Sequence, residues 1–486
     1  MYIIIPLNAR TKCFWRFYMT KKSLLTLVWA IFLVLMFAAC GNDKNKEESE
    51  ITDTDNTDTV TDTADSCDTE TSPDEDNADS TDSCDTETVT DDDNTDAGWE
   101  TKYQKADESA EKVSEDVVKA NNRFGMKIFS RLAKEEGAKN IMISPLSISI
   151  AMAMTANGAV DETLSEMKEV LGFGNMNMPD VNEQFEQLIA SLVEADKYMT
   201  LEIADSLWLD DRFAPDVKDD FISVLEDYYS AALFTEDFAD PATADKINSW
   251  VSEKTHEKIG KIIGEIGANT VMYIINAVYF KAGWTHPFAK GLTYSQKFQL
   301  SDGNIKEADL MHAGGDTYAF KIVKENYSIV RIPYGRGVFA FYAIVPSGNV
   351  DDFIEKIAQN DVGSYFESLR ESFDFSLGLP KFRFAYEKSL EDTFKTLGME
   401  RIFAGGLENI SSNVENLHIS NIFHKTFIEV DEEGTEAAAV TAESADTGED
   451  YTPPSVFADR PFVFVIRDER TGSILFVGKV EDPTAE

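Results

Sequence analysis

The residue types that most often carry chemistry are scattered along this sequence of 486 residues. The five histidines occur singly, without an acidic partner or second ligand at motif spacing: His256, His286, His312, His418 and His424. A serine nucleophile elbow, a phosphate-binding loop, a dinucleotide fingerprint and a His-Glu-x-x-His pair are all absent. The sequence therefore argues against an enzyme, and we expect no catalytic residue, cofactor or metal site.

Two of the four cysteines, Cys67 and Cys84, lie in a duplicated segment, DSCDTET, at residues 65–71 and 82–88. Carboxylates beside thiols can bind a metal weakly. An incidental repeat, with or without a local disulfide, is the simpler interpretation. The region after residue 84 contains no cysteine, so its stability cannot depend on disulfides or thiolate metal sites.

Acidic residues dominate the composition. The chain has 88 Asp and Glu against 44 Lys and Arg, a formal net charge of −44, so we expect no nucleic-acid partner because phosphates would be repelled. Gly41 to Gly98 contains 22 acidic residues and only two lysines. Such a tract has too little apolar surface to offset chain entropy. We predict that residues 40–108 form a disordered, self-repelling tether.

The N-terminal segment has the features of an export signal. Lysines follow Met19, a largely apolar run extends from Leu24 to Ala39, and Cys40 comes next. The run is short for a membrane span and typical of a secretory signal. It resembles a bacterial lipoprotein signal, in which the cysteine after the cleavage site is lipidated. We predict a signal peptide at residues 1–39, with Met19 as an alternative start, and an extracytoplasmic, surface-anchored protein; a plain secretory signal is the alternative.

One stretch near the C-terminus is unusual. VDEEGTEAAAVTAESADTGEDYTPP, Val430–Pro454, is acidic, rich in small residues and flanked by two apolar, strand-like runs. It lacks the apolar face of a buried helix, and its first half is poor in turn residues. Connections of this length are usually functional or disordered. The stretch has the composition of an exposed strand without a partner.

The region from residue 109 to 486 has a globular composition and no second linker. SEDVVKANNRFGMKIFSRLAKE and SPLSISIAMAMTANGA predict helices. TVMYIINAVYFKAGW, YSIVRIPYG, VFAFYAIVPSG, FDFSLGLPKFRFAY and the two runs around the unusual stretch predict strands. Because helices and strands do not alternate regularly, we predict an α+β fold with large antiparallel sheets.

Several long segments resemble the serpin family, in the family's order: NIMISPLSISIAMAMTANGAVDET, INAVYFKAGWTHPF, LPKFRFAYEKSLEDTFKTLGM, IFHKTFIEVDEEGTEAAAVTA and RPFVFVIRDERTGSILFVGKVEDP. The resemblance covers nearly everything after about residue 112, and we assign residues 109–486 to a serpin domain. It implies three β-sheets, about nine helices and a monomer, and it identifies the unusual stretch as an exposed reactive-centre loop.

The resemblance implies that a protease cleaves this loop and that the N-terminal half of the loop then inserts into the main sheet as a new strand. The implied hinge comprises Glu432, Gly434, Thr435, Ala437, Ala438 and Ala439. In a strand, alternate residues face the core, and the first of these, from Thr435 to Thr441, are small. Glu443 is a departure, because it places a charge on the inward-facing register.

The position of the scissile bond depends on where the count starts. Counting from the hinge places it at Gly448–Glu449, whereas counting back from the strand after the loop places it at Asp450–Tyr451. We prefer the hinge count, because only the segment before the bond inserts. The loop contains no Lys or Arg, which disfavours trypsin-like enzymes. Elastase-like or subtilisin-like serine proteases are expected, and an acid-selective or a cysteine protease is the alternative.

The resemblance also implies roles for residues distant from the loop. Ser144, Ser147, Asn276 and His424 match the shutter, a hydrogen-bonded cluster under the sheet, and Trp284 matches the breach, where insertion begins. The predicted function is therefore a suicide inhibitor that traps a protease as a covalent acyl-enzyme. The alternative is a non-inhibitory surface binding protein with the same fold, which a protease would cleave only as a substrate.

Overall fold

Residues 96–314, 320–323, 326–367, 369–371, 376–411, 413, 417–435 and 455–485 are described by a computed structural model. Within them lie ten α-helices: α2 (Asp96–Ala110), α3 (Glu115–Glu136), α4 (Pro145–Ala156), α5 (Asp161–Leu171), α6 (Met178–Leu192), α7 (Asp219–Tyr229), α8 (Ala242–Lys254), α9 (Val350–Ala358), α10 (Gly363–Glu367) and α11 (Glu391–Thr396). No helix in this described part of the chain is long and apolar enough to span a bilayer.

The helix that matters most for the site is α4. Its sequence is apolar on all sides, and almost every residue in it is buried. Pro145 occupies the first turn, where its missing N–H costs nothing. Ser144 caps the helix by accepting a hydrogen bond from the backbone N–H of Ser147 at 3.1 Å. The N-terminus of α4 is thereby fixed beside strand β4 (Met272–Gly283).

A seven-stranded sheet forms one part of the core. Its order is β1 (Ile141–Ile143), β17 (Ile474–Val480), β16 (Phe462–Asp468), β9 (Phe339–Pro346), β8 (Tyr327–Tyr334), β7 (Phe320–Val323) and β10 (Arg370–Glu371). Every residue of β9 and β17 is buried. These strands are covered on both faces, which explains their continuous apolar runs in the sequence.

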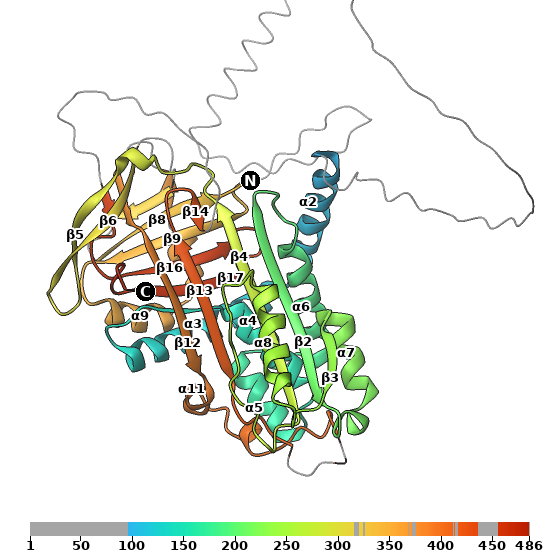
Figure 1. The fold of residues 1–486 in the computed structure, drawn as a ribbon. Helices are drawn as coiled ribbons and strands as arrows, with labels where there is room; N and C mark the ends of the chain where they lie inside the picture. The colour runs from blue at the N-terminus through green and yellow to red at the C-terminus, as the bar shows by residue number, and fades with distance from the viewer. Residues whose placement is uncertain are drawn as a thin grey trace, which may run out of the picture. The chain divides into compact units, whose positions relative to one another are not determined.

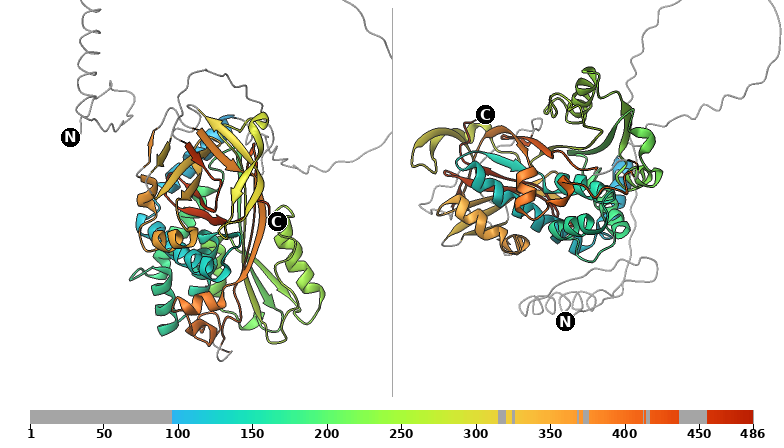
Figure 2. Two further views of the ribbon diagram at one scale, coloured as in Figure 1. Left: turned by 90° about the vertical axis from the view of Figure 1, so that its left-hand side faces the viewer. Right: turned by 90° about the horizontal axis from the view of Figure 1, so that it is seen from below.

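A six-stranded sheet faces the viewer in Figure 1. Its order is β12 (Phe382–Ser389), β13 (Phe423–Val430), β14 (Gly434–Thr435), β4 (Met272–Gly283), β2 (Met199–Asp210) and β3 (Ala232–Glu236). Figure 2 shows this sheet edge-on, with α8 on its outer face and the helices from the first half of the chain on the other. Ile247 and Val251 of α8 pack against Ile275 of β4.

The smallest sheet has four strands, in the order β15 (Ser455–Phe457), β11 (Ser376–Pro380), β6 (Ile305–Gly314) and β5 (Thr293–Gln299). Its strand β15 begins immediately after residues 436–454, which lie outside the described residues. The three sheets and mixed helices confirm the predicted α+β fold. The ten helices of the described residues are close to the number of about nine that the resemblance implies.

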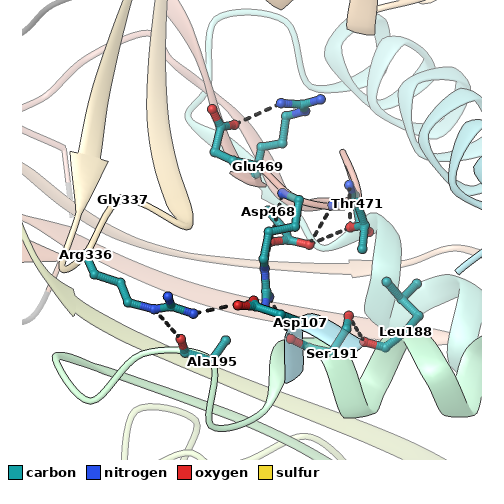
Figure 3. A network of polar contacts seen from close by, with 12 residues as sticks. Asp107, Leu188, Ser191, Ala195, Arg336, Gly337, Asp468, Glu469 and Thr471 are labelled. Carbon is teal, nitrogen blue, oxygen red and sulfur yellow. Dashed lines mark hydrogen bonds and ion pairs between the residues drawn. The ribbon is translucent and has the colours of Figure 1, made fainter. Parts of the chain in front are cut away.

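Helix α2 is held by a network of ion pairs shown in Figure 3. The carboxylate of Asp107 accepts a hydrogen bond from Arg470 at 3.0 Å and lies 3.5 Å from the guanidinium of Arg336. The same guanidinium lies 4.1 Å from the ring centroid of Tyr103. Arg470 also donates to the carbonyl of Ser191 at 2.6 Å. These contacts join α2 to α6 and to two turns of the seven-stranded sheet.

This helix corrects one prediction. The sequence predicts a disordered tether as far as residue 108, but residues 96–108 belong to α2. The acidic composition of the tract concealed Trp99, Tyr103 and Ala106, the helix residues that make ring or buried contacts. The signal peptide, Cys40 and the tract up to residue 95 lie outside the described residues and remain predictions.

Candidate functional site

The six-stranded sheet contains an incomplete strand position. Among the described residues, β13 and β4 are joined only through the two residues of β14, where Thr435 pairs with Val430 on one side and with Ala282 on the other. Below Thr435, the facing edges of β4 and β13 have no ladder partner in the described part of the chain. Two facing strand edges without a ladder partner among the described residues can serve as a template for one additional strand. We call this position the slot.

A tight turn brings the chain from β13 into the top of the slot. The Asp431 carboxylate accepts hydrogen bonds from the N–H groups of Glu433, at 2.9 Å, and Gly434, at 3.1 Å. Gly434 has φ of +155°, and a Cβ added there would lie 2.1 Å from the carbonyl oxygen of Ala282. Only glycine fits, because β4 approaches the backbone too closely for any side chain.

Aromatic side chains pack around the entry to the slot. The rings of Trp284 and Tyr334 stack with centroids 4.6 Å apart, and the indole N–H donates to the carbonyl of Asp431 at 2.9 Å. The Tyr334 hydroxyl lies 2.6 Å from the Thr435 hydroxyl. Burial raises the pKa of Tyr334, so the phenol remains neutral. Thr435 therefore points inward, with its polar atom satisfied.

Two lysines hold the acidic turn. Lys381 pairs with Glu432 at 2.8 Å, and Lys290 pairs with Glu433 at 2.6 Å. Burial opposes ionisation of Glu432, but the hydrogen bonds from Lys381 and from its own backbone N–H outweigh it, and its pKa is lowered. Glu432 is therefore ionised at the point where the loop begins, and the ammonium group of Lys381 neutralises its charge.

Lower in the slot, a chain of hydrogen bonds passes beneath the gap. On one wall, the Nε2 atom of His424 accepts from the backbone N–H of Ser144 at 3.1 Å. On the other wall, the side-chain oxygen of Asn276 accepts from the hydroxyl of Ser147. Because Ser144 and Ser147 are joined by the cap of α4, the two walls are linked through the helix and not directly to each other.

The protonation state of His424 is fixed by this geometry. Burial lowers the pKa of His424 to about 4. Its Nε2 atom must be unprotonated to accept from the Ser144 amide, because a proton there would set two donors against each other. At neutral pH the imidazole is therefore uncharged, and the hydrogen bond between β13 and α4 is intact.

A cavity of about 650 Å³ lies between the two walls. Its floor is one face of α4, formed by Ser144, Ser147, Ile148, Ala151, Met152 and Thr155, and its walls are residues 269–278 and 417–426. Directly below Thr435 the space is smaller, about 20 Å³, because Phe280, Ile428 and Phe476 fill it. The slot is thus packed at its entry and open along its lower part.

Comparison with known proteins assigns this architecture. The family model "Serpin (serine protease inhibitor)" matches residues 119–483. The chain is a serpin. An uncharacterised serpin-like protein of Methanosarcina acetivorans is 31% identical over 387 residues, covering 76% of this chain and 87% of that one. Human Serpin A12 is 31% identical over 373 residues, covering 76% of this chain and 89% of its own.

A solved structure gives the same result. The crystal structure of the thermophilic serpin tengpin in its native state has a TM-score of 0.66 and 30% sequence identity to this chain. It is matched over 79% of this chain and 94% of its own. The predicted family is therefore confirmed, and with it a protein of protease-inhibitor type.

The structure groups the predicted site residues of this serpin into two clusters. Glu432, Gly434, Thr435 and Trp284 meet at the entry to the slot. The second cluster, lower in the slot, joins Ser144, Ser147, Asn276 and His424. Ala437, Ala438, Ala439 and both candidate scissile bonds, Gly448–Glu449 and Asp450–Tyr451, lie outside the described residues.

Sequence reasoning missed three residues of this site. Tyr334, at the end of β8, and Lys381, between β11 and β12, contact the hinge from distant parts of the chain, and no local pattern marks them. Asp205 of β2 accepts from the Asn276 amide at 2.9 Å and is buried. It had a detectable signal, because it occupies an inward position in the alternating sequence from Leu201 to Leu209, where apolar residues are expected.

One group of carboxylates in the described chain has metal-like spacing. Oxygen atoms of Asp210, Asp211 and Asp237 lie within 4.8 Å of one another. The Asp210 carboxylate already accepts from Arg212 at 2.7 and 2.8 Å, and it also accepts the N–H of Phe238. The hydrogen bonds from Arg212 lower the pKa of Asp210. A protein cation therefore satisfies this group.

Proposed function

We propose that this serpin is a suicide inhibitor of serine proteases, or of cysteine proteases as a second class, which incorporates its own cleaved loop into the slot. The observation that carries the proposal is the strand position below Thr435, between β4 and β13, which no described residue occupies. A protease that cleaves the loop forms an acyl-enzyme. Insertion then carries the enzyme along the sheet before the acyl bond is hydrolysed, and the strained native state is relaxed.

The register of β14 predicts how the loop would be placed. If the pairing of Thr435 with Val430 and Ala282 continues, Thr441 would lie between His424 and Asn276. The inward residues before it, Ala437 and Ala439, are small enough to enter beneath neighbouring side chains. Insertion would then bring the two walls of the shutter together through one new strand.

The same register supports the hinge count for the scissile bond. If the register is extended past the ends of β4 and β13, position 448 falls opposite Asn269 and Leu417, which both line the cavity. Cleavage at Gly448–Glu449 would therefore release a segment that reaches the end of the cavity walls. Cleavage at Asp450–Tyr451 would add two residues beyond them. Glu443, in turn, would lie between Ile274 and Ile422, so its burial should slow the last part of insertion.

The loop sequence favours particular partners. Residues 433–458 contain no Lys or Arg, and four acidic residues precede Tyr451 from Glu443 onward. A trypsin-like pocket with a buried carboxylate would find no cation and would meet like charge. Elastase-like or subtilisin-like enzymes, which accept small side chains such as Thr447 and Gly448, are the proposed targets. An acid-selective protease is the second choice.

The proposed setting is the cell surface. An acyl chain on Cys40 would anchor the protein outside the cytoplasmic membrane, because each buried methylene contributes about 0.8 kcal/mol. The acidic tract would hold the serpin domain away from the bilayer. We propose a monomer in this setting. Mass spectrometry of the membrane fraction tests the anchor, and a free thiol on a mature N-terminal Cys40 or a cut elsewhere would contradict it.

The experiment that tests the function uses the full chain with a panel of elastase-like, acid-selective and trypsin-like proteases. We expect a covalent complex that survives denaturing gel electrophoresis with an elastase-like enzyme, and mass spectrometry should locate the cut between Thr447 and Tyr451. Clean cleavage without a complex would favour the non-inhibitory alternative. Rapid complex formation with trypsin through the loop would contradict the proposed specificity.

A pair of variants isolates insertion from cleavage. Thr435→Arg places a guanidinium at a buried position beside the Tyr334 hydroxyl, where an unpaired charge costs several kcal/mol. The matched control is Thr200→Arg, at an exposed position of β2 in the same sheet. We expect the first variant to be cleaved as a substrate and the control to form the complex.

A further inference from the structure

Asp205 is a carboxyl group buried beneath the sheet without a cation. It lies on β2, and only 4% of its surface is exposed. Its Oδ1 atom accepts from the Asn276 amide at 2.9 Å, and its Oδ2 atom is buried without a hydrogen-bond partner among the described residues. A buried carboxylate with an unmatched oxygen is expensive, because neither water nor a partner replaces its hydration.

The groups around Asp205 offer no compensating positive charge. From α7, Tyr229 is the titratable neighbour, and burial together with the nearby carboxyl raises the pKa of its phenol. The Tyr229 hydroxyl donates to Asn182 of α6 at 2.8 Å. Helix α4 contains no charged residue, and β4 presents Asn276. His424, the one titratable group on β13 in this network, is reached only through the two serines of α4.

Asn276 separates Asp205 from the slot. Asn276 lines the cavity, whereas Asp205 is not among its lining residues. The amide uses its N–H₂ group on Asp205 and its oxygen on Ser147, so both of its ends are occupied. Any movement of β4 away from α4 that releases Asn276 from Ser147 therefore also opens a path for water to the carboxyl.

We propose that Asp205 is a positioning residue of this serpin, which holds the Asn276 amide at the slot wall and makes the separation of β4 from α4 depend on pH. The proposal rests on the proposed function, because the wall that Asn276 fixes is one of the two along which the loop would insert. In its neutral form Asp205 tolerates the closed network, in which Asn276 accepts from Ser147. In its ionised form it favours the hydrated, open arrangement, so β4 separates from α4 more readily as the pH rises toward neutrality.

The direction follows from the titration. Burial raises the pKa of Asp205 to about 7 in the closed state. Water that reaches the carboxyl on opening returns its pKa toward the ordinary value, near 3.9. Opening therefore becomes more favourable as the pH rises from about 4 to about 7, and changes little above pH 7. Each unit of pKa difference between the closed and open states changes the opening equilibrium tenfold.

Hydrogen exchange of the backbone amides tests the proposal without a protease. Wild type and Asp205→Asn are compared at the same pH, from about 4.5 to 8.5, so that the intrinsic pH dependence of exchange cancels. We expect the ratio of the exchange rates of β4 amides around Asn276, wild type over variant, to rise at least tenfold between pH 4.5 and 7 and then to level off. Amides of β9 should show no such difference. A ratio independent of pH would overturn the proposal.

A second variant protects the test against misfolding. Asp205→Glu retains a titratable carboxyl and should keep the pH-dependent exchange of β4, which a purely structural role of the aspartate would not predict. If Asp205→Asn does not fold, the comparison of Asp205→Glu and wild type between β4 and β9 supports or overturns the proposal alone. Failure to form a protease complex at any pH would reject the proposed function and leave the exchange result independent.

Discussion

The two larger sheets of this serpin differ in the continuity of their strand pairing. In the seven-stranded sheet, each of the strands β1, β17, β16, β9, β8, β7 and β10 pairs with its neighbours in that order, with one register shift at Ile466 and Arg467. In the six-stranded sheet, the described ladder between β13 and β4 stops after the two residues of β14. Within the described residues, the chain therefore builds one complete sheet and one sheet with an unoccupied strand position.

The side chains match this difference. In the complete sheet, Phe341 and Phe464 stack across neighbouring strands with ring centroids 5.6 Å apart, and all of β9 is buried. In the incomplete sheet, β13 alternates between buried and partly exposed residues. Its buried His424 accepts from the N-cap residue of α4, Ser144, and its buried Thr426 donates to the carbonyl of Met142 on β1. The complete sheet gains nothing further from rearrangement, whereas the incomplete sheet gains a ladder.

The largest expected effect is therefore cleavage of the loop itself. Insertion would add on the order of ten backbone hydrogen bonds at about 1 kcal/mol each, which corresponds to a rise in Tm on the order of 20 °C. Gly434→Val should abolish the rise, because a side chain there collides with the carbonyl of Ala282. Differential scanning calorimetry before and after nicking measures both.

The control for this prediction is Gly348→Val, at a position with open space around it. That variant should show the full rise in Tm on cleavage. If cleaved wild type melts at the temperature of the intact protein, the slot does not accept the loop, and the contrast between the two sheets has no functional meaning.

A change in the complete sheet should behave differently. Phe464→Ala removes a fully buried ring that contacts Phe341 and Phe382. Truncations of this kind cost about 3–5 kcal/mol. We expect the variant to lower the stability of the intact and the cleaved forms by similar amounts, because insertion leaves this sheet unchanged. Denaturant unfolding of both forms measures the two losses, and a loss confined to one form would contradict the comparison.

The complete sheet was also the easier one to predict. Runs such as FVFVIRD and ILFVGKV predict buried strands directly, and the structure confirms β16 and β17. The slot could not be derived from local sequence pattern, because β4 and β13 each have an ordinary strand sequence and only their pairing is missing among the described residues. The shutter residues were assigned through the family resemblance, and the structure brings Ser144 and His424 together across 280 residues.

Other parts were outside the reach of sequence reasoning for physical reasons. Helix α2 has few apolar residues and is held largely by ion pairs with distant arginines, which no local periodicity reveals. Asp205 could be recognised as a polar residue in an alternating run, but its contact with Asn276 joins separate strands and has no local signal. Tyr334 meets Thr435 only because the turn after β8 lies beside Trp284, a tertiary contact between separate strands.

The next effect concerns pH and the lower part of the slot. Burial depresses the pKa of His424 to about 4 in the folded state, against about 6.5 in the unfolded chain. The native state therefore loses stability as the pH falls from 6.5 to 4, by about 3 kcal/mol in total. His424→Gln keeps an acceptor for the Ser144 amide and removes the titration. Relative to wild type, the variant should gain that amount over the same interval.

Asp205 contributes with the opposite sign. Its pKa is raised in the folded state, so its contribution falls as the pH rises from about 4 to 7. Over pH 4 to 6.5 the two slopes offset each other in wild type, and His424→Gln exposes that of Asp205. Urea unfolding at half-unit intervals of pH measures the difference between variant and wild type. A difference that does not vary with pH would place His424 outside the titrating network.

The smallest expected effect tests whether helix α2 stabilises the seven-stranded sheet or the slot. Asp107→Asn retains the shape of the side chain and removes the charge that faces Arg336 and Arg470. The Asp107 side chain is about half exposed, so solvent screening limits its contribution to under about 1 kcal/mol.

Arg470 lies in the turn between β16 and β17, and Arg336 lies in the turn after β8, both in the complete sheet. We therefore expect equal small losses of stability in the intact and cleaved forms, measured by paired denaturant titrations. A loss in the intact form alone would show instead that α2 acts on the slot, through the short path from Arg336 to Tyr334 and Thr435.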